Sequence, residues 1–472
     1  MIKFGTGGWR AIIADEFTRS NIQLLCQGLA NMMHDEGVAE QGIIIGYDRR
    51  FLSRESAGWA AEVLAGNGIC CYIIDREAPT PLIMFTVKQF QTSYGLAVTA
   101  SHNPAQYNGI KVFAKGGRDA DEETTNRLEV YIGQIEPGSV FVLPLDLAES
   151  QGLILYINPF NQYIDAIISS VDMDAIRGRN LKIALDPMYG VSRTCLQTIL
   201  MTARCDVEVI HERRDTLFGG RLPSPNVETL NALRQVVLEQ HCDLGIATDG
   251  DADRLGIIDD LGQFVHPNQI LVLLYYYLLA HKGWRGPCVR NLATTHLLDR
   301  VAAHFGETCY EVPVGFKHIS AKMQETGAII GGESSGGLAV RGHIPGKDGI
   351  YAAVLLVEMI AVTGQSLSEL YRGITDQFGE WFMAESDHRF TKAMKESITK
   401  TLMVEHQLPE FSEPVERVGW TDGCKVYFEN GGWVIARFSG TEPLLRIFCE
   451  MPTKEQAEQI SAQLAYHLGL SS

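Results

Sequence analysis

The chain has 472 residues, of which 46% are hydrophobic and 21% charged, and its formal net charge is −17. The length exceeds what one hydrophobic core organises, so we expect three or four domains. The acidic balance argues against a nucleic-acid partner, because phosphate-backbone binding needs a basic surface. An anionic substrate must therefore be held by a few locally placed Arg and Lys side chains.

The cysteines and the apolar runs indicate where the protein works. Most of the ten cysteines lie in apolar runs such as GICCYIID and LRIFCEMP, without zinc-site spacing, so we expect reduced, buried thiols rather than disulfides or metal ligands. The N-terminal MIKFGTGGWR lacks the apolar core of a signal peptide, and the longest apolar run, 270–280, is too short to span a bilayer. We expect a cytoplasmic protein with no membrane partner.

Short β-rich runs alternate with segments of helical periodicity along most of the chain. In the first region we predict strands at 42–48, 70–75 and 94–101, with helices at 53–68 and 81–90. The same order returns from residue 181 and again from residue 287. Strands that alternate with helices predict βαβ units and mostly parallel, covered sheets. We interpret the three regions as three copies of one α/β unit.

The last region, from about residue 375, has a different pattern. Residues 425–452 read as strands joined by turns, and residues 454–470 have helical periodicity, which predicts an α+β domain. The expected fold is therefore α/β: three similar α/β domains with mixed, mostly parallel sheets, plus a C-terminal α+β domain, arranged around a central cleft. The expected boundaries are 1–150, 151–258, 259–372 and 373–472.

The terminal strands of the three α/β regions run into the polar loops TASHNP, TDGDADR and GGESSGG. In open α/β sheets, ligands gather at the carboxyl ends of strands. In the first loop, Ser101 is either a nucleophile or part of a turn into a helix. Asn103 suits an N-cap, Pro104 suits the first helical position, and Asn108-Gly109 reads as a further turn. The loop alone leaves both interpretations standing.

The strongest single motif is ATDGDADRLGIIDD, in which Asp249, Asp251 and Asp253 follow an apolar strand at alternate positions. Three carboxylates this close repel unless a cation lies among them, and their oxygens suit Mg²⁺. An EF-hand fails because Arg254 stands where that loop needs Gly and a strand precedes the motif. Arg254 beside a cation offers a place for a phosphate, and a solvated acidic turn is the alternative.

The loop RFSGTEPLLR groups hydrogen-bond donors that fit a dianionic phosphate. They come from Arg437, Ser439, Gly440, Thr441 and, behind the loop, Arg446. A polar β-turn with an ion pair to Glu442 is the alternative.

Two glycine-rich segments add weaker signals. In GGESSGG, Glu333 and Ser335 could bind sugar hydroxyls, or the segment is a flexible turn. In FGTGGWR, Arg10 follows glycines that let backbone approach a phosphate. A P-loop, a GxSxG nucleophile elbow and a GxGxxG fingerprint are all missing from the sequence.

With these loops assembled, the chain resembles the α-D-phosphohexomutase superfamily, and most closely its phosphoglucomutase/phosphomannomutase branch. The matching segments are FGTGGWR, TASHNPAQYNGIKV, DGDADR, GGESSGG with KDGI downstream, and RFSGTEPLLR. They occur in the family's order and cover all four expected domains.

The resemblance implies a Mg²⁺-dependent phosphohexomutase that carries Ser101 as a phosphoserine and forms a hexose 1,6-bisphosphate. The metal would be held by the three aspartates and the phosphoserine oxygen. Lys111 would be the general acid/base, with His102 and Arg10 supporting the phosphoserine and Arg254 offsetting charge. The implied substrate contacts are Glu333, Ser335, Lys317 and Lys347, and the implied phosphate contacts are Arg437, Ser439, Gly440, Thr441 and Arg446.

One departure from the family pattern is Gly337, where many members have His. We expect His343 or Lys347 to fill that space. Glucose is the expected sugar, mannose the second and glucosamine the third, because GGESSGG resembles the phosphoglucosamine mutase loop less closely. The competing classes are a non-catalytic sugar-phosphate-binding protein and a phosphatase acting through the same phosphoserine. The expected partner is a small-molecule sugar phosphate, and the expected assembly is a monomer or homodimer.

Overall fold

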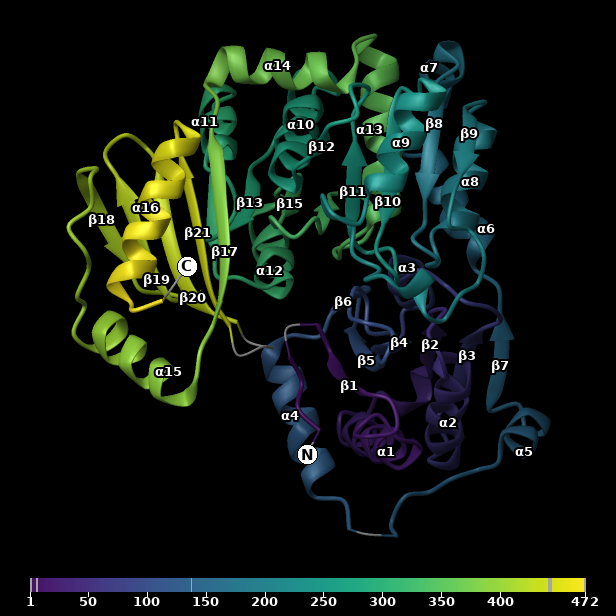
Figure 1. Cartoon of the computed structure of the whole chain (residues 1–472). Coiled ribbons are helices and arrows are strands. Elements are labelled where there is room, and N and C mark those ends of the chain that lie inside the picture. The colour runs from purple at the N-terminus through teal and green to yellow at the C-terminus, as the bar shows by residue number, and fades with distance from the viewer. Residues whose placement is uncertain (1, 6, 137, 440–443, 471–472) are drawn as a thin grey trace. The chain divides into compact units, whose positions relative to one another are not determined.

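The structure is a computed structural model of the chain, and it describes residues 2–5, 7–136, 138–439 and 444–470 (Figure 1). The chain divides into two compact units. The first comprises Met1–Ile270 and Ser335–Ser368, and the second comprises Leu271–Ser334 and Glu369–Ser472.

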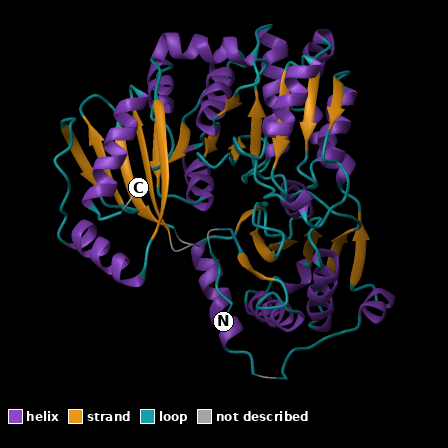
Figure 2. Cartoon of the chain, in the orientation of Figure 1, coloured by secondary structure: helices purple, strands orange, loops and turns teal. Residues whose placement is uncertain are grey.

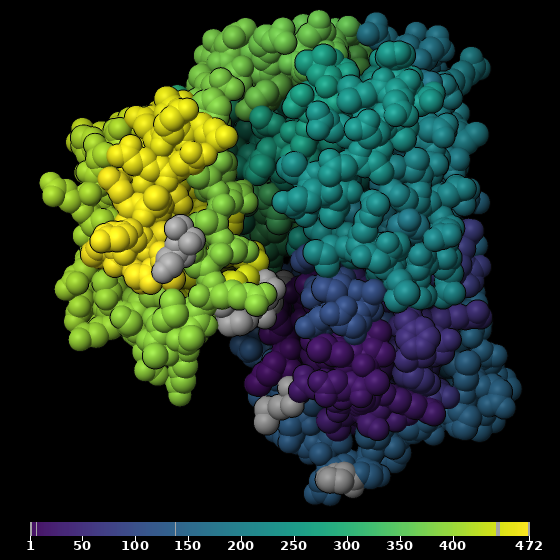
Figure 3. Space-filling model, in the orientation of Figure 1, coloured from purple at the N-terminus to yellow at the C-terminus, as the bar shows by residue number. Residues whose placement is uncertain are grey.

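The first unit begins with a seven-stranded sheet of order β1-β5-β4-β2-β3-β7, in which β6 also pairs with β5. The strands are β1 (Trp9–Ile12), β2 (Ile43–Tyr47), β3 (Cys71–Ile74), β4 (Tyr94–Val98), β5 (Tyr107–Ala114), β6 (Arg118–Asp119) and β7 (Ile154–Ile157). The associated helices are α1 (Arg19–Asp35), α2 (Ser53–Gly66), α3 (Thr80–Phe90), α4 (Glu122–Gly133) and α5 (Leu145–Ser150). Sheet and helices form one closely packed body, coloured purple to blue in Figure 3.

Helices on both faces of this sheet explain its sequence pattern. β2 pairs in parallel with β3 and β4, and every residue of β2 and β4 is buried. α2 and α3 both pack against β2. A strand covered on both faces has a continuous apolar sequence rather than an alternating one, which explains the run Ile43–Tyr47 without a charged residue.

The second sheet repeats the arrangement of the first. Its order is β12-β11-β10-β8-β9, with β8 (Lys182–Asp186), β9 (Asp206–Val209), β10 (Leu244–Thr248), β11 (Leu255–Ile258) and β12 (Phe264–Val265). In the first sheet β2 lies between the parallel strands β3 and β4, and β5 pairs antiparallel with β4. In the second sheet β8 lies in the same way between β9 and β10, and β11 pairs antiparallel with β10. Its helices are α6 (Phe160–Ile168), α7 (Met173–Arg179), α8 (Arg193–Thr202) and α9 (Asn231–Gln240).

The first unit is completed by β16 (Leu338–Val340) and α13 (Gly349–Thr363). The side chain of Asp348 caps α13 by accepting hydrogen bonds from the backbone N–H groups of Ile350 and Tyr351. α13 packs against β10 and β11, as Figure 1 shows.

The second unit combines a parallel strand group with an antiparallel sheet (Figure 2). In the first, β13 (Cys288–Asn291) lies between β14 (Cys309–Val312) and β15 (Ile330–Gly332), with helices α11 (Leu297–His304) and α12 (Phe316–Thr326). The antiparallel sheet has the order β17-β21-β20-β19-β18. Its strands are β17 (Phe382–Arg389), β18 (Val415–Gly419), β19 (Cys424–Phe428), β20 (Trp433–Phe438) and β21 (Leu444–Met451), with α15 (Lys392–Ile398) and α16 (Lys454–His467).

The expected fold class is confirmed: mixed α/β sheets recur along the chain, and a C-terminal α+β domain follows them. The expected central cleft and the four domain boundaries stay predictions. The apolar run 270–280 lies in α10 (Pro267–Ala280). No single helix in the described ranges is long and apolar enough to cross a membrane, and α13 meets that test only when taken together with α14 (Leu367–Phe378), which is bent away from it.

Gly109 in β5 is a point of close approach. A Cβ atom there would lie 2.3 Å from the carbonyl oxygen of Trp9 and 2.8 Å from that of Thr99. Gly109 stands opposite Arg10 of β1, and its carbonyl accepts a hydrogen bond from the N–H of Thr99. Glycine therefore lets β1 and the loop after β4 close on β5 from two sides.

Gly109→Ala is expected to lower the free energy of unfolding by about 1–3 kcal/mol, because backbone must move to admit the methyl group. Chemical denaturation measures the change. The control is Gly178→Ala in α7, where an added Cβ meets nothing within 4 Å and Ala favours the helix. Equal stability of the two variants would show that the approach at Gly109 is not tight.

Candidate active site

Three carboxylates gather in the loop between β10 and β11. Asp249, Asp251 and Asp253 each offer an oxygen within 4.8 Å of the other two, and all three side chains are buried. The loop reaches this shape with Ala252 in the left-handed region, at a φ of 63°. The three aspartates predicted from their spacing therefore do converge.

The donor set fits a hard divalent cation. Asp251 Oδ1 and Asp253 Oδ1 are buried and have no hydrogen-bond partner among the described residues, and unpaired buried oxygens are costly unless something binds them. Burial, followed by the charges of Asp251 and Asp253, raises the pKa of Asp249 well above its usual range. A bound cation would relieve this repulsion.

Two lysines face the aspartates. Lys111 Nζ lies 2.7 Å from one oxygen of Asp251 and 2.7 Å from one of Asp253, and Lys347 Nζ lies 3.0 Å from Asp253. Burial alone would raise the pKa of Asp253, but Lys111, Lys347 and Arg254 outweigh it and hold that pKa well below its usual range. Burial opposes the charged form of Lys111, yet Asp251 and Asp253 raise its pKa. Lys111 is therefore a protonated, buried ammonium.

Ser101 lies against the same aspartates. Its Oγ donates a 2.7 Å hydrogen bond to Asp249 Oδ2 and lies 3.3 Å from His102 Nδ1. The φ of Ser101 is 51°, a left-handed conformation that costs a non-glycine residue on the order of 1–3 kcal/mol. A Cβ at Gly250 would lie 2.8 Å from the Ser101 carbonyl oxygen. Glycine at that position thus lets the serine loop and the aspartate loop touch.

The serine loop turns back into a strand, not into a helix. The N–H of Asn103 donates to the carbonyl of Ala100, and β5 begins at Tyr107. No helix starts at Asn103-Pro104, so the alternative in which this loop leads into a helix is not borne out, and Asn108-Gly109 lies inside β5 rather than in a turn. β5 pairs with both β1 and β4, and pairing on two sides overrides local turn preference.

Arg50, which the sequence motifs did not single out, organises the serine loop. Its side chain is 1% exposed and donates to four backbone carbonyls. Nη2 lies 2.6 Å from those of Ser101 and Asn103, and Nη1 lies 2.9 and 3.0 Å from those of Pro104 and Tyr107. Arg50 follows β2 at the sheet edge where ligands gather, so its charge directly after an apolar strand was the available signal.

Thr80 also contributes to the site, and no sequence signal pointed to it. It is the first residue of α3, and its Oγ1 donates a 2.6 Å hydrogen bond to Asp251 Oδ2. Its backbone N–H donates to the carbonyl of the same aspartate. Thr80 thereby fixes the aspartate loop against α3.

The other predicted residues of the first unit lie in the same region. Arg10 Nη1 donates a 2.8 Å hydrogen bond to Asn103 Oδ1, and the backbone N–H of Arg254 donates to Asp249 Oδ1 at 3.0 Å. Arg254, followed by burial and Arg10, holds the pKa of His102 well below its usual range, which makes His102 a neutral imidazole. Ser335 is exposed, four residues before Ala339 of β16.

Lys347 fills the space beside Gly337. A Cβ at Gly337 would lie 2.3 Å from Lys347 Cδ and 3.0 Å from its Cγ. His343 is held elsewhere, with its Nε2 2.7 Å from Asp348 Oδ2 and its ring 4.8 Å from that of Tyr351. Of the two residues expected to occupy this space, the geometry favours Lys347.

Two of the four predicted substrate contacts, Glu333 and Lys317, lie in the second unit, whereas Ser335 and Lys347 belong to the first. Glu333 directly follows β15, and its Oε1 accepts hydrogen bonds of 3.3 Å from Asn291 Nδ2 and from the N–H of Gly315. Lys317 is in the first turn of α12, which Gly315 begins at a φ of 128°. The ends of β13, β14 and β15 thus meet around Glu333.

The phosphate-binding candidates lie on the antiparallel sheet of the same unit. Arg437 of β20 stands opposite Arg446 of β21, and Ser439 directly follows β20. Gly440 and Thr441 fall outside the described residues. Because the two units are described separately, the convergence of their residues on one substrate stays a prediction.

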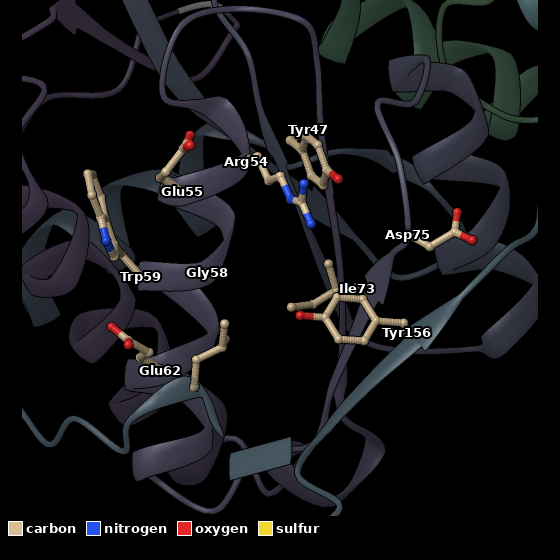
Figure 4. A pocket seen from close by; sticks show the side chains of 10 residues that line it. Tyr47, Arg54, Glu55, Gly58, Trp59, Glu62, Ile73, Asp75 and Tyr156 are labelled. Carbon is tan, nitrogen blue, oxygen red and sulfur yellow. The ribbon is translucent and has the colours of Figure 1, made fainter. Parts of the chain in front are cut away.

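A cavity of about 370 Å³ lies elsewhere in the first unit. Figure 4 shows Trp59 and Glu62 on one side of it and Asp75 and Tyr156 on the other. No residue predicted from the sequence motifs lines this cavity, so it is separate from the candidate active site.

Four family models match successive parts of the chain. They are the phosphoglucomutase/phosphomannomutase α/β/α domains I, II and III, over residues 1–138, 161–262 and 266–378, and the phosphoglucomutase/phosphomannomutase C-terminal domain, over residues 394–467.

Similar proteins match over nearly their whole length. A "Phosphoglucomutase/phosphomannomutase" of Thermococcus kodakarensis is 29% identical, covering 97% of this chain and 96% of that protein. A "Probable phosphoglucosamine mutase" of Pyrococcus abyssi is 31% identical, with 97% and 95% covered. The crystal structure of a putative phosphomannomutase from Thermus thermophilus superposes with a TM-score of 0.86 at 29% identity, covering 99% of both chains.

Removing the Lys347 ammonium is expected to raise the affinity of the aspartates for Mg²⁺, because the ammonium competes with the cation for Asp253. Lys347→Met should tighten binding on the order of tenfold, or about 1.4 kcal/mol, in isothermal titration calorimetry. Gly337→Ala should act in the same direction by pushing Lys347 aside. The matched control is exposed Lys115→Met, with wild-type affinity. An unchanged affinity in Gly337→Ala would show that Lys347 does not occupy that space.

Proposed function

The chain belongs to the α-D-phosphohexomutase superfamily, and on that premise we propose that it interconverts hexose 1-phosphates and hexose 6-phosphates through a phosphorylated Ser101. The single observation that carries this proposal is the 2.7 Å contact of Ser101 Oγ with the buried aspartate cluster. A hydroxyl held against a cation site and flanked by Lys and Arg side chains suits phosphoryl transfer, which depends on positioning and on charge stabilisation.

The residues around Ser101 match the charge that a phosphoserine brings, roughly −1.5 to −2 at neutral pH. We assign Mg²⁺ to Asp249, Asp251 and Asp253, with an oxygen of the phosphoserine completing the set. When bound, Mg²⁺ would supply positive charge beside the transferring phosphoryl group. Arg254 supplies further positive charge from the protein.

Ser101 exchanges its phosphoryl group with the sugar in two steps. First, the bond from phosphorus to Ser101 Oγ breaks while a bond to the free sugar hydroxyl forms, which gives a hexose 1,6-bisphosphate. The bisphosphate then turns, and Ser101 Oγ takes back the other phosphoryl group. Each step moves one proton between the sugar hydroxyl and Ser101 Oγ, and we assign this transfer to Lys111, whose Nζ is buried 2.7 Å from Asp251. In the first step the Lys111 ammonium donates its proton to Ser101 Oγ as the bond to phosphorus breaks, and the resulting amine takes up the proton that the sugar hydroxyl loses. The second step moves the protons in the opposite direction.

The second unit would bind the part of the substrate that does not react. We assign the sugar hydroxyls to Glu333 and Lys317 of the second unit and to Ser335 of the first. The unreactive phosphate goes to Arg437, Ser439 and Arg446, together with Gly440 and Thr441. Arginine is suited to this task because its planar fork binds phosphate through two hydrogen bonds.

The proposed sugar is glucose, followed by mannose and then glucosamine. The similar proteins named above include one called a phosphoglucomutase/phosphomannomutase and one called a phosphoglucosamine mutase. These three sugars differ only at C2, and the second name favours glucosamine 1-phosphate as the alternative substrate. All three 1-phosphates therefore belong in the assay.

Ser101→Ala is expected to abolish turnover of hexose 1-phosphate, because the variant lacks the hydroxyl that is proposed to carry the phosphoryl group. The assay supplies each 1-phosphate with Mg²⁺ and a trace of the matching 1,6-bisphosphate, and it follows both isomer formation and free phosphate. The intact mass of the wild-type protein should show one added phosphoryl group that the variant lacks. Full turnover by the variant would refute the mechanism, and phosphate release without isomer formation would indicate a phosphatase.

Mg²⁺ is expected to raise the melting temperature of the wild-type protein, because a ligand at 100 times its Kd adds about 2.7 kcal/mol of stability. Asp251→Asn should lose most of this rise, since it removes one of the three carboxylates. Exposed Asp15→Asn is the control and should keep it. Differential scanning calorimetry with and without chelator measures the difference. A rise that survives in Asp251→Asn would place the cation elsewhere.

A further inference from the structure

Two consecutive backbone N–H groups in the loop between β14 and α12 are held by carboxylates. The N–H of Gly315 donates to Glu333 at 3.3 Å, and the N–H of Val314 donates to Asp422 Oδ2 at 3.0 Å. Glu333 belongs to the sugar-binding candidates, whereas Asp422 lies far along the chain, in the turn between β18 and β19. The loop that leads to Lys317 is thus fixed from two directions.

The same oxygen of Asp422 contacts the leading phosphate-binding candidate. Arg437 Nε lies 3.4 Å from Asp422 Oδ2, and the two side chains are 12% and 27% exposed. That Nε is buried without a hydrogen bond in the described part of the chain, so the carboxylate is what faces it. Contact at Nε leaves the two terminal nitrogens of Arg437 for a phosphate.

The surrounding packing keeps Asp422 in this place. A Cβ at the next residue, Gly423, would lie 2.4 Å from the carbonyl oxygen of Ala436 and 2.8 Å from Arg437 Cβ. Val314 packs against an apolar cluster that joins the end of β13 to the antiparallel sheet, formed by Leu292, Ala293, Tyr427, Trp433 and Ile435. The turn that carries Asp422 therefore packs closely against β20, and Val314, its hydrogen-bond partner, packs against the same sheet.

We propose that Asp422 is a positioning residue: one of its carboxylate oxygens fixes the loop before Lys317 and the phosphate-binding Arg437 at a set distance from each other. This inference rests on the proposed function, because it assigns Arg437 and the loop before Lys317 to the same substrate. A sugar phosphate presents its ring and its phosphate at a fixed separation. A single anchor shared by both contact groups holds the protein to that separation.

A nearby negative charge with no positioning role would have the opposite effect on binding. It would repel the substrate phosphate, so its removal in Asp422→Asn would tighten phosphate binding. Positioning predicts that Asp422→Asn weakens binding instead, because the neutral amide holds the guanidinium less well. The sign of the change therefore separates the two roles.

The test compares Asp422→Asn and Asp422→Ala with wild type in the full-length protein. KM for hexose phosphate should rise about tenfold to a hundredfold in both variants, with a smaller change in kcat. Hydrogen exchange at the amide of Val314 should speed up in Asp422→Ala but stay slow in Asp422→Asn, whose amide oxygen still accepts the hydrogen bond. The control is Glu413→Gln, whose carboxylate bonds Asn430 and Gln456 in the same domain and should leave KM unchanged.

Titration with inorganic phosphate keeps this inference separable from the proposed function. If the wild-type protein turns over no hexose phosphate, the proposed function fails, while weaker phosphate binding in Asp422→Asn still supports the anchor. Unchanged or tighter phosphate binding in Asp422→Asn overturns the inference, and so does slow Val314 exchange in Asp422→Ala. In Arg437→Ala, the further change Asp422→Asn should no longer affect phosphate affinity, and a full additional loss there would also overturn it.

Discussion

The mutual repulsion of three buried carboxylates is the constraint that organises the first unit. One carboxylate oxygen each of Asp249, Asp251 and Asp253 lies within 4.8 Å of the other two, and all three side chains are buried. Such a cluster is stable only beside compensating positive charge. The protein supplies that charge from separate places: Lys111 on β5 and Lys347 in the segment before α13. The fold of this unit therefore brings lysine side chains that are far apart in the sequence to one acidic loop.

In the second unit, a carboxylate that pairs with buried cationic side chains links the parallel strands to the antiparallel sheet. Glu311 of β14 accepts hydrogen bonds from Arg290 of β13 and from Lys425 and Tyr427 of β19. Burial would raise the pKa of Glu311, but its hydrogen-bonded and cationic neighbours hold it below its usual range. Breaking one partner would leave buried charge uncompensated. The parallel strands and the antiparallel sheet consequently behave as one body, which is what allows Asp422 to relate a loop of one to an arginine of the other.

The sequence predicts most where chemistry is concentrated in consecutive residues. The aspartate motif was identifiable from its spacing alone, whereas Ser101 was identifiable only once the other motifs and the family resemblance were considered together. Arg50 belongs to no polar motif, and its one available signal was a charge shortly after an apolar strand. Asp422 had no signal, because its contacts with the N–H of Val314 and with Arg437 exist only in the folded chain. The turn that Asn108-Gly109 suggested does not form, because pairing of β5 on both sides outweighs local preference. Which of His343 and Lys347 lies beside Gly337 could not be predicted from the sequence, because it depends on how the folded chain fills that space.

Arg50 holds the loop at Ser101 through main-chain oxygens alone. Main-chain oxygens are the same whatever side chain stands on the residue, so these four hydrogen bonds do not depend on which side chain stands at position 101. A thiol or a methyl group in place of the hydroxyl would leave the hydrogen bonds from Arg50 in place. The side chain at position 101 and the hydrogen bonds that Arg50 makes to the loop can therefore change independently, in evolution or in protein engineering.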